Sequence, residues 1–188
     1  MLTHVINNLK SGGAQKLVIE LSTRLSGSID CVIIVFNKDI SANYLEAIRE
    51  HNIQIINFWL SPFHSCKILT MSRIVFVHLF PSMYLVSLIK IFSRRVMFVE
   101  HSTYNRRRKF AIFRYLDLLV YSKYQKIICV SNLVKESLIA FYKINSNKLI
   151  VAKNGIAIEN FSLGLDINKG PSQKKIIGTL GRITEAKN

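Results

Sequence analysis

The chain has few cysteines, prolines, glycines and acidic residues. Its three cysteines, Cys31, Cys66 and Cys129, lie far apart and form no C-x-x-C pair. Three thiols cannot all pair within one chain, so they argue against a disulfide-built fold and favour a reducing, cytoplasmic compartment. Three prolines and eight glycines among 188 residues exclude a collagen-like or linker-like chain.

Acidic residues are the scarcest charged group. The chain has 11 acidic residues and 26 lysines and arginines, which gives a formal net charge of +15. Such a charge concerns binding partners rather than fold, and it suits nucleic acid, an anionic membrane surface or a phosphate-bearing substrate. Hydrophobic residues make up 49% of the chain, which is enough for a packed core and excludes disorder.

Targeting and membrane segments are not evident. The N-terminus, MLTHVINNLKSGG, has no charged segment followed by an apolar one and is not a signal peptide. The longest apolar stretch, residues 74–92, could span a bilayer by length but contains His78, Pro81 and Lys90. It is better interpreted as a strand, a turn at Phe80–Ser82 and a helix that begins at Ser82.

Apolar runs alternate with helical patterns along the chain. Continuous apolar runs bounded by polar residues are typical of strands that are buried on both faces. The predicted strands are THVINNL, DCVIIVFN, IQIINF, SRIVFVHLF, RRVMFVEH, KIICVS and NKLIVAKNGI. This alternation predicts an α/β fold, a doubly wound, Rossmann-like parallel sheet of about seven strands.

The pattern changes near residue 160. Residues 1–160 form the predicted Rossmann-like domain, and the polar segment 161–174, with Gly164, Gly170 and Pro171, reads as a linker. A new strand begins at Lys175 and is followed by Arg182 and Lys187, so residues 175–188 are expected to begin a second domain. We therefore expect a truncated product or a partial sequence.

Two segments after predicted strands could bind a ligand. Gly12 and Gly13, in SGGAQK, open the first helix, where free backbone N–H groups favour an anion. A tight turn without a ligand explains them as well, and the segment is not the dinucleotide motif G-x-G-x-x-G. His101 ends the strand of FVEHST, where it could contact a sugar or phosphate or simply face solvent. The other four histidines lack metal-ligand spacing, so no metal site is predicted.

Basic residues cluster in the middle of the chain. Arg106, Arg107, Arg108 and Lys109 precede an apolar helix, and the segment 90–126 has ten basic and two acidic residues. Together with Phe110, Phe113, Tyr115 and Tyr121, the cluster suits either anionic lipid or nucleic acid. Arg182 and Lys187, which follow a strand, could hold a diphosphate.

Five segments in order resemble glycosyltransferase family 4, retaining enzymes with the GT-B fold. They are NNLKSGGAQK, with Gln15 where an acid is common, VEHST, IICVSNLVKESL, VAKNGIAIENF and GTLGRITEAKN. The resemblance implies two Rossmann-like domains, an N-terminal one for the acceptor and a C-terminal one for the nucleotide-sugar. It implies Gly12 and Gly13 near the donor phosphates, His101 near the transferred sugar, and Arg182 with Lys187 on the diphosphate.

The activity implied by the resemblance is hexosyl transfer with retention from a nucleotide-sugar. The acceptor would be a polysaccharide or lipid-linked saccharide, as in lipopolysaccharide or capsule synthesis. No metal or cofactor is implied, because the nucleotide-sugar is a substrate. We expect a cytoplasmic protein, peripheral on the membrane through Arg106–Lys109 and not bound to nucleic acid. Without a complete donor domain, this chain alone is expected to be inactive. The alternative is a non-catalytic basic α/β module that binds anionic membrane or nucleic acid.

Overall fold

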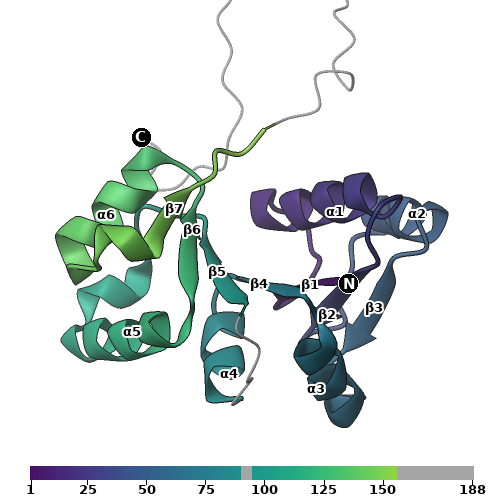
Figure 1. Ribbon diagram of the computed structural model, residues 1–188, viewed down its shortest axis with the longest axis horizontal. Helices are drawn as coiled ribbons and strands as arrows, with labels where there is room; N and C mark the ends of the chain where they lie inside the picture. The colour runs from purple at the N-terminus through teal and green to yellow at the C-terminus, as the bar shows by residue number, and fades with distance from the viewer. Residues whose placement is uncertain (90–94, 156–188) are drawn as a thin grey trace, which may run out of the picture. The chain divides into compact units, whose positions relative to one another are not determined.

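A computed structural model describes residues 1–89 and 95–155 of the chain. Within it, Met1–Asn154 form one compact unit. The unit is a seven-stranded parallel sheet with helices on both faces (Figure 1). The predicted α/β, doubly wound class is therefore confirmed. The linker expected at 161–174 and the domain start expected at 175–188 lie outside the described residues.

The strands follow the order β3-β2-β1-β4-β5-β6-β7 across the sheet. They are β1 (Leu2–Ile6), β2 (Cys31–Val35), β3 (Gln54–Asn57), β4 (Ile74–His78), β5 (Val96–Glu100), β6 (Lys126–Cys129) and β7 (Leu149–Val151). The order reverses between β1 and β4, the point at which open α/β sheets hold their ligands beyond the carboxyl ends of the strands.

Helices join most of the strands, since parallel strands need crossover connections. They are α1 (Gly13–Leu25), α2 (Ala42–Glu50), α3 (Pro62–Met71), α4 (Ser82–Leu88), α5 (Ala111–Lys123) and α6 (Asn132–Tyr142). Two short 3₁₀ helices, η1 (Arg106–Lys109) and η2 (Ser146–Lys148), precede α5 and β7. Helices α1 and α2 cover one face near β1 to β3, and α3 and α4 lie on the other (Figure 1).

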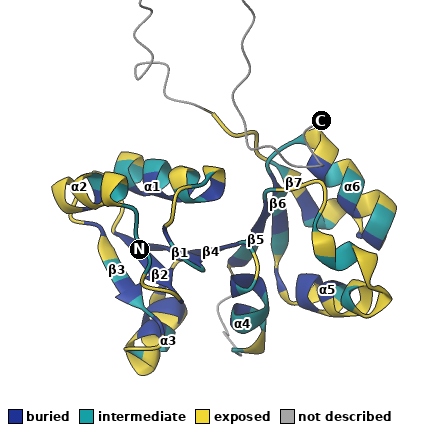
Figure 2. Ribbon diagram, turned by 180° about the vertical axis from the view of Figure 1, so that it is seen from behind, coloured by how far each residue is buried: buried dark blue, intermediate teal, exposed yellow. Residues whose placement is uncertain are grey.

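The strands are buried because helices or neighbouring strands cover their apolar side chains. Every residue of β1 and β2 is buried, and Figure 2 shows the dark strands lying between helices with exposed outer faces. One apolar cluster lies on each face of the sheet. The smaller cluster, with Ile6, Val18, Ile33 and Ile48, lies beneath α1 and α2.

Helix α1 meets the sheet through a set of residues that its apolar spacing predicts only in part. The spacing favoured Leu17, Val18, Leu21 and Leu25; Val18 is fully buried, but the three leucines are only partly buried. The buried residues of α1 are Ala14, Val18, Ile19 and Ser22.

Two sequence predictions about helices have different outcomes. The strand, turn and helix predicted for residues 74–92 are confirmed as β4 and α4 in the described part of that stretch. No helix in the described ranges is long and apolar enough to cross a membrane. Helix α3, in contrast, was not predicted. Its amphipathic pattern is weak because Phe63 is 91% exposed, and the main signal for it is Pro62 in the first turn.

Candidate functional site

An open cleft of about 570 Å³ lies where the first strands end. Because parallel strands end at one edge, the segments that follow β1, β2 and β3 converge there with the start of α4. The lining residues are Asn7, Phe36, Asn37, Lys38, Asn57, Trp59, Leu60, Pro81 and Leu85. Three amides, one lysine and exposed apolar side chains therefore share a single cleft.

Trp59, the only tryptophan, is held in this cleft by aromatic neighbours. Its ring centroid lies 5.2 Å from that of Phe58 and 6.0 Å from that of Phe36. The side-chain oxygen of Asn57 accepts hydrogen bonds from the backbone N–H groups of Trp59 and Leu60, at 3.1 and 3.2 Å. The turn is thus fixed while 61% of Trp59 stays exposed. Trp59 lies in no recognisable sequence motif and was not among the predicted site residues.

His101 lies directly after β5, at the same edge of the sheet, as predicted from the sequence. It is not alone, because its Nε2 lies 3.1 Å from Nδ1 of His78, the last residue of β4. The Nε2 of His78 lies 3.0 Å from Nδ1 of His4, in the middle of β1. Three histidines from three neighbouring strands therefore form one hydrogen-bonded row.

Burial keeps the row uncharged near neutral pH. Loss of solvent lowers the pKa of His4 to about 4 and that of His101 to about 4. The same burial lowers the pKa of His78, and the neighbouring His4 and His101 lower it further. Each ring can therefore serve as one donor and one acceptor.

Sequence spacing alone does not connect His4 and His78 with His101, because His4 and His78 have no partner at metal-ligand spacing. Strand parity and sheet order explain the juxtaposition. His4 is paired with Phe76 and His78 with Val99, so His4, His78 and His101 lie on one face of adjacent strands. Among residues 1–89 and 95–155, no group of three or more His, Cys, Asp or Glu side chains could hold a metal ion.

Gly12 and Gly13 lie at the start of α1, as predicted. The first bond of the helix runs from the N–H of Lys16 to the carbonyl of Gly12, at 2.9 Å, so the N–H groups of residues 13–15 precede the helix's own bonding. A Cβ at Gly12 would lie 2.4 Å from Oε1 of Gln15, the flexible end of a side chain, and one at Gly13 would meet nothing within 4 Å. No steric contact among the described residues therefore requires glycine at position 12 or 13.

Of the four residues in the basic cluster, Arg107 and Arg108 are partly buried, whereas Arg106 and Lys109 are exposed. Arg107 lies 3.5 Å from the carboxylate of Asp117, and the two side chains are 16% and 0% exposed. Asp117 also accepts hydrogen bonds from the hydroxyls of Tyr84 and Tyr142. Burial and this bond to Asp117 raise the pKa of Tyr142 to about 12.

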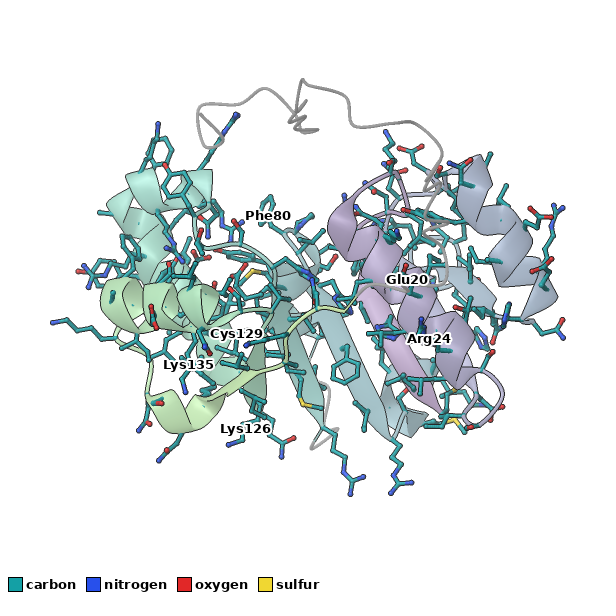
Figure 3. All side chains as sticks on the ribbon, turned by 90° about the horizontal axis from the view of Figure 1, so that it is seen from above. Glu20, Arg24, Phe80, Lys126, Cys129 and Lys135 are labelled. Carbon is teal, nitrogen blue, oxygen red and sulfur yellow. The ribbon has the colours of Figure 1, made fainter. Side chains whose placement is uncertain are left out.

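Arg107 and Arg108 also stack on aromatic rings. The Arg107 guanidinium lies 4.6 Å from the centroid of Phe80, which projects beyond the strands at their carboxyl edge (Figure 3). Arg108 donates to the carbonyl of Thr103 at 2.7 Å and to the hydroxyl of Ser137 at 2.6 Å. It thereby ties the loop after His101 to α6. Only Arg106 and Lys109 of the four are exposed.

Helix α5 presents apolar side chains to solvent and a carboxylate to the core, the reverse of an ordinary surface helix. Its buried residues are Asp117, Val120 and Tyr121. Tyr121 is 1% exposed and donates to the buried carboxylate of Glu100 at 2.9 Å, so it does not belong to a docking surface as its place in the sequence suggested. The outward residues are Ile112, Tyr115, Leu116 and Leu119, and Phe110 precedes them.

The two remaining predicted residues, Arg182 and Lys187, lie outside the residues that the structure describes. The described part of the site thus comprises the cleft, the histidine row and the start of α1. All three lie on segments at or near the carboxyl edge of the sheet.

This edge of a doubly wound parallel sheet is where open α/β folds bind their ligands. The family model for Glycosyltransferase Family 4 matches residues 11–160. The chain belongs to this family, which confirms the resemblance noted from its sequence. A comparison with curated proteins found no significant match.

Solved structures with the same fold are GT-B glycosyltransferases. Anabaena HepE, crystallised with UDP and glucose, matches with a TM-score of 0.69 and 13% identity over 89% of this chain and 48% of its own. The complex of HepE with UDP-glucose matches with a TM-score of 0.66 and 12% identity, over 84% and 44%. A glycosyltransferase from Rickettsia africae matches with a TM-score of 0.65 and 20% identity, over 84% and 44%. The chain thus spans less than half the length of these structures.

Loss of Arg107 should destabilise the fold, whereas loss of Arg106 should not. The Arg107→Gln substitution leaves a fully buried carboxylate without its cation, and we expect the free energy of unfolding to fall by about 3 kcal/mol. Arg106→Gln, the matched control on an exposed side chain, should change it by less than about 0.5 kcal/mol. Chemical denaturation measures both values. Equal losses in the two variants would contradict the division of the cluster.

Stability should decrease with acidification because of His4. The folded-state pKa, about 4, lies below the ordinary 6.5, so the unfolded chain binds the proton first as pH falls. The stabilisation is complete above pH 6.5 and disappears as pH falls towards 4, and between pH 7 and 4.5 it amounts to about 2–3 kcal/mol. Denaturation at several pH values should show this slope in the wild type.

The matched control for this slope is an exposed histidine. We expect His4→Phe to make the slope shallower by the His4 contribution, while His78 and His101, whose pKa values are lowered as well, keep theirs. His64→Phe, on the outside of α3, should keep the full slope. A His4→Phe variant with the full wild-type pH dependence would show that other groups cause the loss.

Proposed function

We propose that the complete protein transfers a hexose, with retention, from a nucleotide-sugar to a polysaccharide or lipid-linked saccharide. Family membership supports transfer in general. The observation that carries the donor class is that the matching structures of Anabaena HepE were solved with UDP and glucose and with UDP-glucose. Synthesis of a surface polysaccharide, such as lipopolysaccharide or capsule, at the cytoplasmic side of the membrane fits this reaction.

The proposed division of labour follows the fold. The donor diphosphate would lie near the start of α1 at Gly12 and Gly13, and Arg182 with Lys187 would hold it from the second domain. His101 would contact the transferred sugar. We assign no metal or cofactor, because fixed cations and helix N–H groups can hold a diphosphate directly. For the 188-residue chain alone we propose acceptor binding without transfer.

The cleft beside Trp59 is the proposed acceptor site. Pyranose rings have apolar C–H faces that pack on aromatic rings, and hydroxyl rims that bond to amides. The cleft offers an exposed indole and the amides of Asn7, Asn37 and Asn57. Lys38, at the same cleft, would suit a phosphate of a lipid-linked acceptor.

Saccharide binding tests the acceptor proposal. Short neutral oligosaccharides, titrated into the 188-residue chain, should bind and quench or shift the fluorescence of its only tryptophan. Calorimetry should show binding about two- to twelvefold weaker in Trp59→Ala, since stacking contributes roughly 0.5–1.5 kcal/mol. Phe63→Ala, which removes a 91% exposed ring outside the cleft, is the control. Equal affinity in Trp59→Ala and the wild type would remove the cleft from the proposal.

We propose in addition that the protein docks on anionic membrane through α5. The exposed stripe Ile112, Tyr115, Leu116 and Leu119 follows the helical spacing i, i+3, i+4, i+7. Arg106 and Lys109 lie just before it and are exposed. Apolar side chains flanked by cations are the composition of a helix that lies in a lipid interface. The same pairing favours lipid over nucleic acid, which offers no apolar phase for the stripe.

Vesicle sedimentation tests the membrane proposal. The chain should bind phosphatidylglycerol vesicles, less so as salt rises, and should not bind phosphatidylcholine vesicles. Arg106→Gln with Lys109→Gln should weaken binding about 30-fold, at roughly 1 kcal/mol for each cation. Ile112→Ser with Leu119→Ser should weaken it as well.

The control pair for charge is Arg49→Gln with Lys67→Gln, which removes one arginine and one lysine from the outsides of α2 and α3. It should bind like the wild type. Equal binding to both lipids, or a preference for nucleic acid at matched salt, would contradict docking through α5. Arg107 and Arg108 are left intact in this test because their substitution would disturb the fold.

A further inference from the structure

The histidine row crosses three strands without an interruption. The ring centroids of His4 and His78 lie 5.2 Å apart, and those of His78 and His101 lie 5.4 Å apart. His4 is 0% exposed and His78 is 1% exposed, whereas His101 is partly accessible at the carboxyl edge. The row therefore runs from the interior of the sheet to the edge where the site lies.

Two hydrogen bonds between neutral rings restrict where the protons can lie. A neutral imidazole carries one N–H and one acceptor nitrogen, so both bonds form only if all three rings point their protons in the same direction. In the outward arrangement, His4 donates to His78, and His78 Nδ1–H donates to Nε2 of His101. In the inward arrangement, every donor and acceptor is exchanged.

The buried end of the row distinguishes the two arrangements. The Nε2 of His4 is buried and has no hydrogen-bond partner among the described residues. Inward polarity would leave an N–H at this atom, and orphaned buried N–H groups are rarer than orphaned acceptors. Outward polarity leaves only an unpaired acceptor there, which is the less costly of the two. The outward arrangement is therefore favoured.

We propose that His78 is a positioning residue which holds His101 as its Nδ1–H tautomer, so that His101 offers a hydrogen-bond donor to the ligand. The Nε2 of His101 is occupied as an acceptor from His78, which leaves Nδ1 as the free nitrogen. His101 then acts toward the ligand as a donor rather than as a base. The identity of that ligand, a hydroxyl or phosphate oxygen of a nucleotide-sugar, rests on the proposed function. The assignment of the His101 tautomer does not depend on it.

Long-range ¹H–¹⁵N NMR spectra of the uniformly labelled 188-residue chain test the proposal directly, because protonated and bare ring nitrogens give distinct shifts. His101→Gln assigns the His101 signals. In the wild type at neutral pH, Nδ1 of His101 should be protonated and Nε2 bare. The opposite pattern, or an unordered mixture, would overturn the proposal.

Two substitutions of His78 separate positioning from packing. His78→Phe keeps an aromatic ring but removes the donor, so His101 should lose its tautomer preference. His78→Asn places an amide N–H where His78 has Nδ1 and should retain the preference. His64→Phe, distant on α3, should leave the spectrum unchanged.

An unchanged His101 pattern in a folded His78→Phe variant would overturn the role of His78. If that variant does not fold, the wild-type pattern and that of His78→Asn still decide the question. Failure of the saccharide titration would count against the proposed function but would leave this result standing.

Discussion

The buried carboxylate of Asp117 fixes the second half of the domain. It is fully buried, and its partners come from three separate elements, Tyr84 on α4, Tyr142 on α6 and Arg107 on η1. A carboxylate in such a place is stable only if donors and a cation surround it. Helices α4, α5 and α6 must therefore keep one mutual arrangement, and the segment between His101 and α5 is drawn into it.

Because of this constraint, the four cations at positions 106–109 have two different roles. The sequence showed one cluster of four cations, whereas the fold uses Arg107 and Arg108 to hold α4, α6 and the loop after His101. With Asp117 inward, the opposite side of α5 carries apolar residues to the surface. The exposed cations Arg106 and Lys109 of η1 therefore lie just before the exposed apolar stripe of α5.

The sheet was predictable because parallel strands are continuous apolar runs, a signal that depends only on neighbouring residues. The position of His101 followed, since strand ends are where ligands bind. Helix α3 and the inward face of α5 were not predictable, because tertiary packing overrides a weak or inverted amphipathic pattern. The histidine row needs the sheet order, which brings β1, β4 and β5 together although 74 positions separate His4 and His78 and 23 separate His78 and His101.

The switch in strand order links the two parts of the candidate site. Since β4 returns to lie beside β1, the cleft receives its lining from the segments after β1 and β2 together with the start of α4. The same return places His78 between His4 and His101. The return of β4 to β1 therefore produces both features: the cleft, whose surface could pack a sugar ring, and His101, whose hydrogen-bond donor has a fixed direction. Their chemistry differs because one is open to solvent and the other is anchored in the interior, where an uncharged ring keeps its orientation.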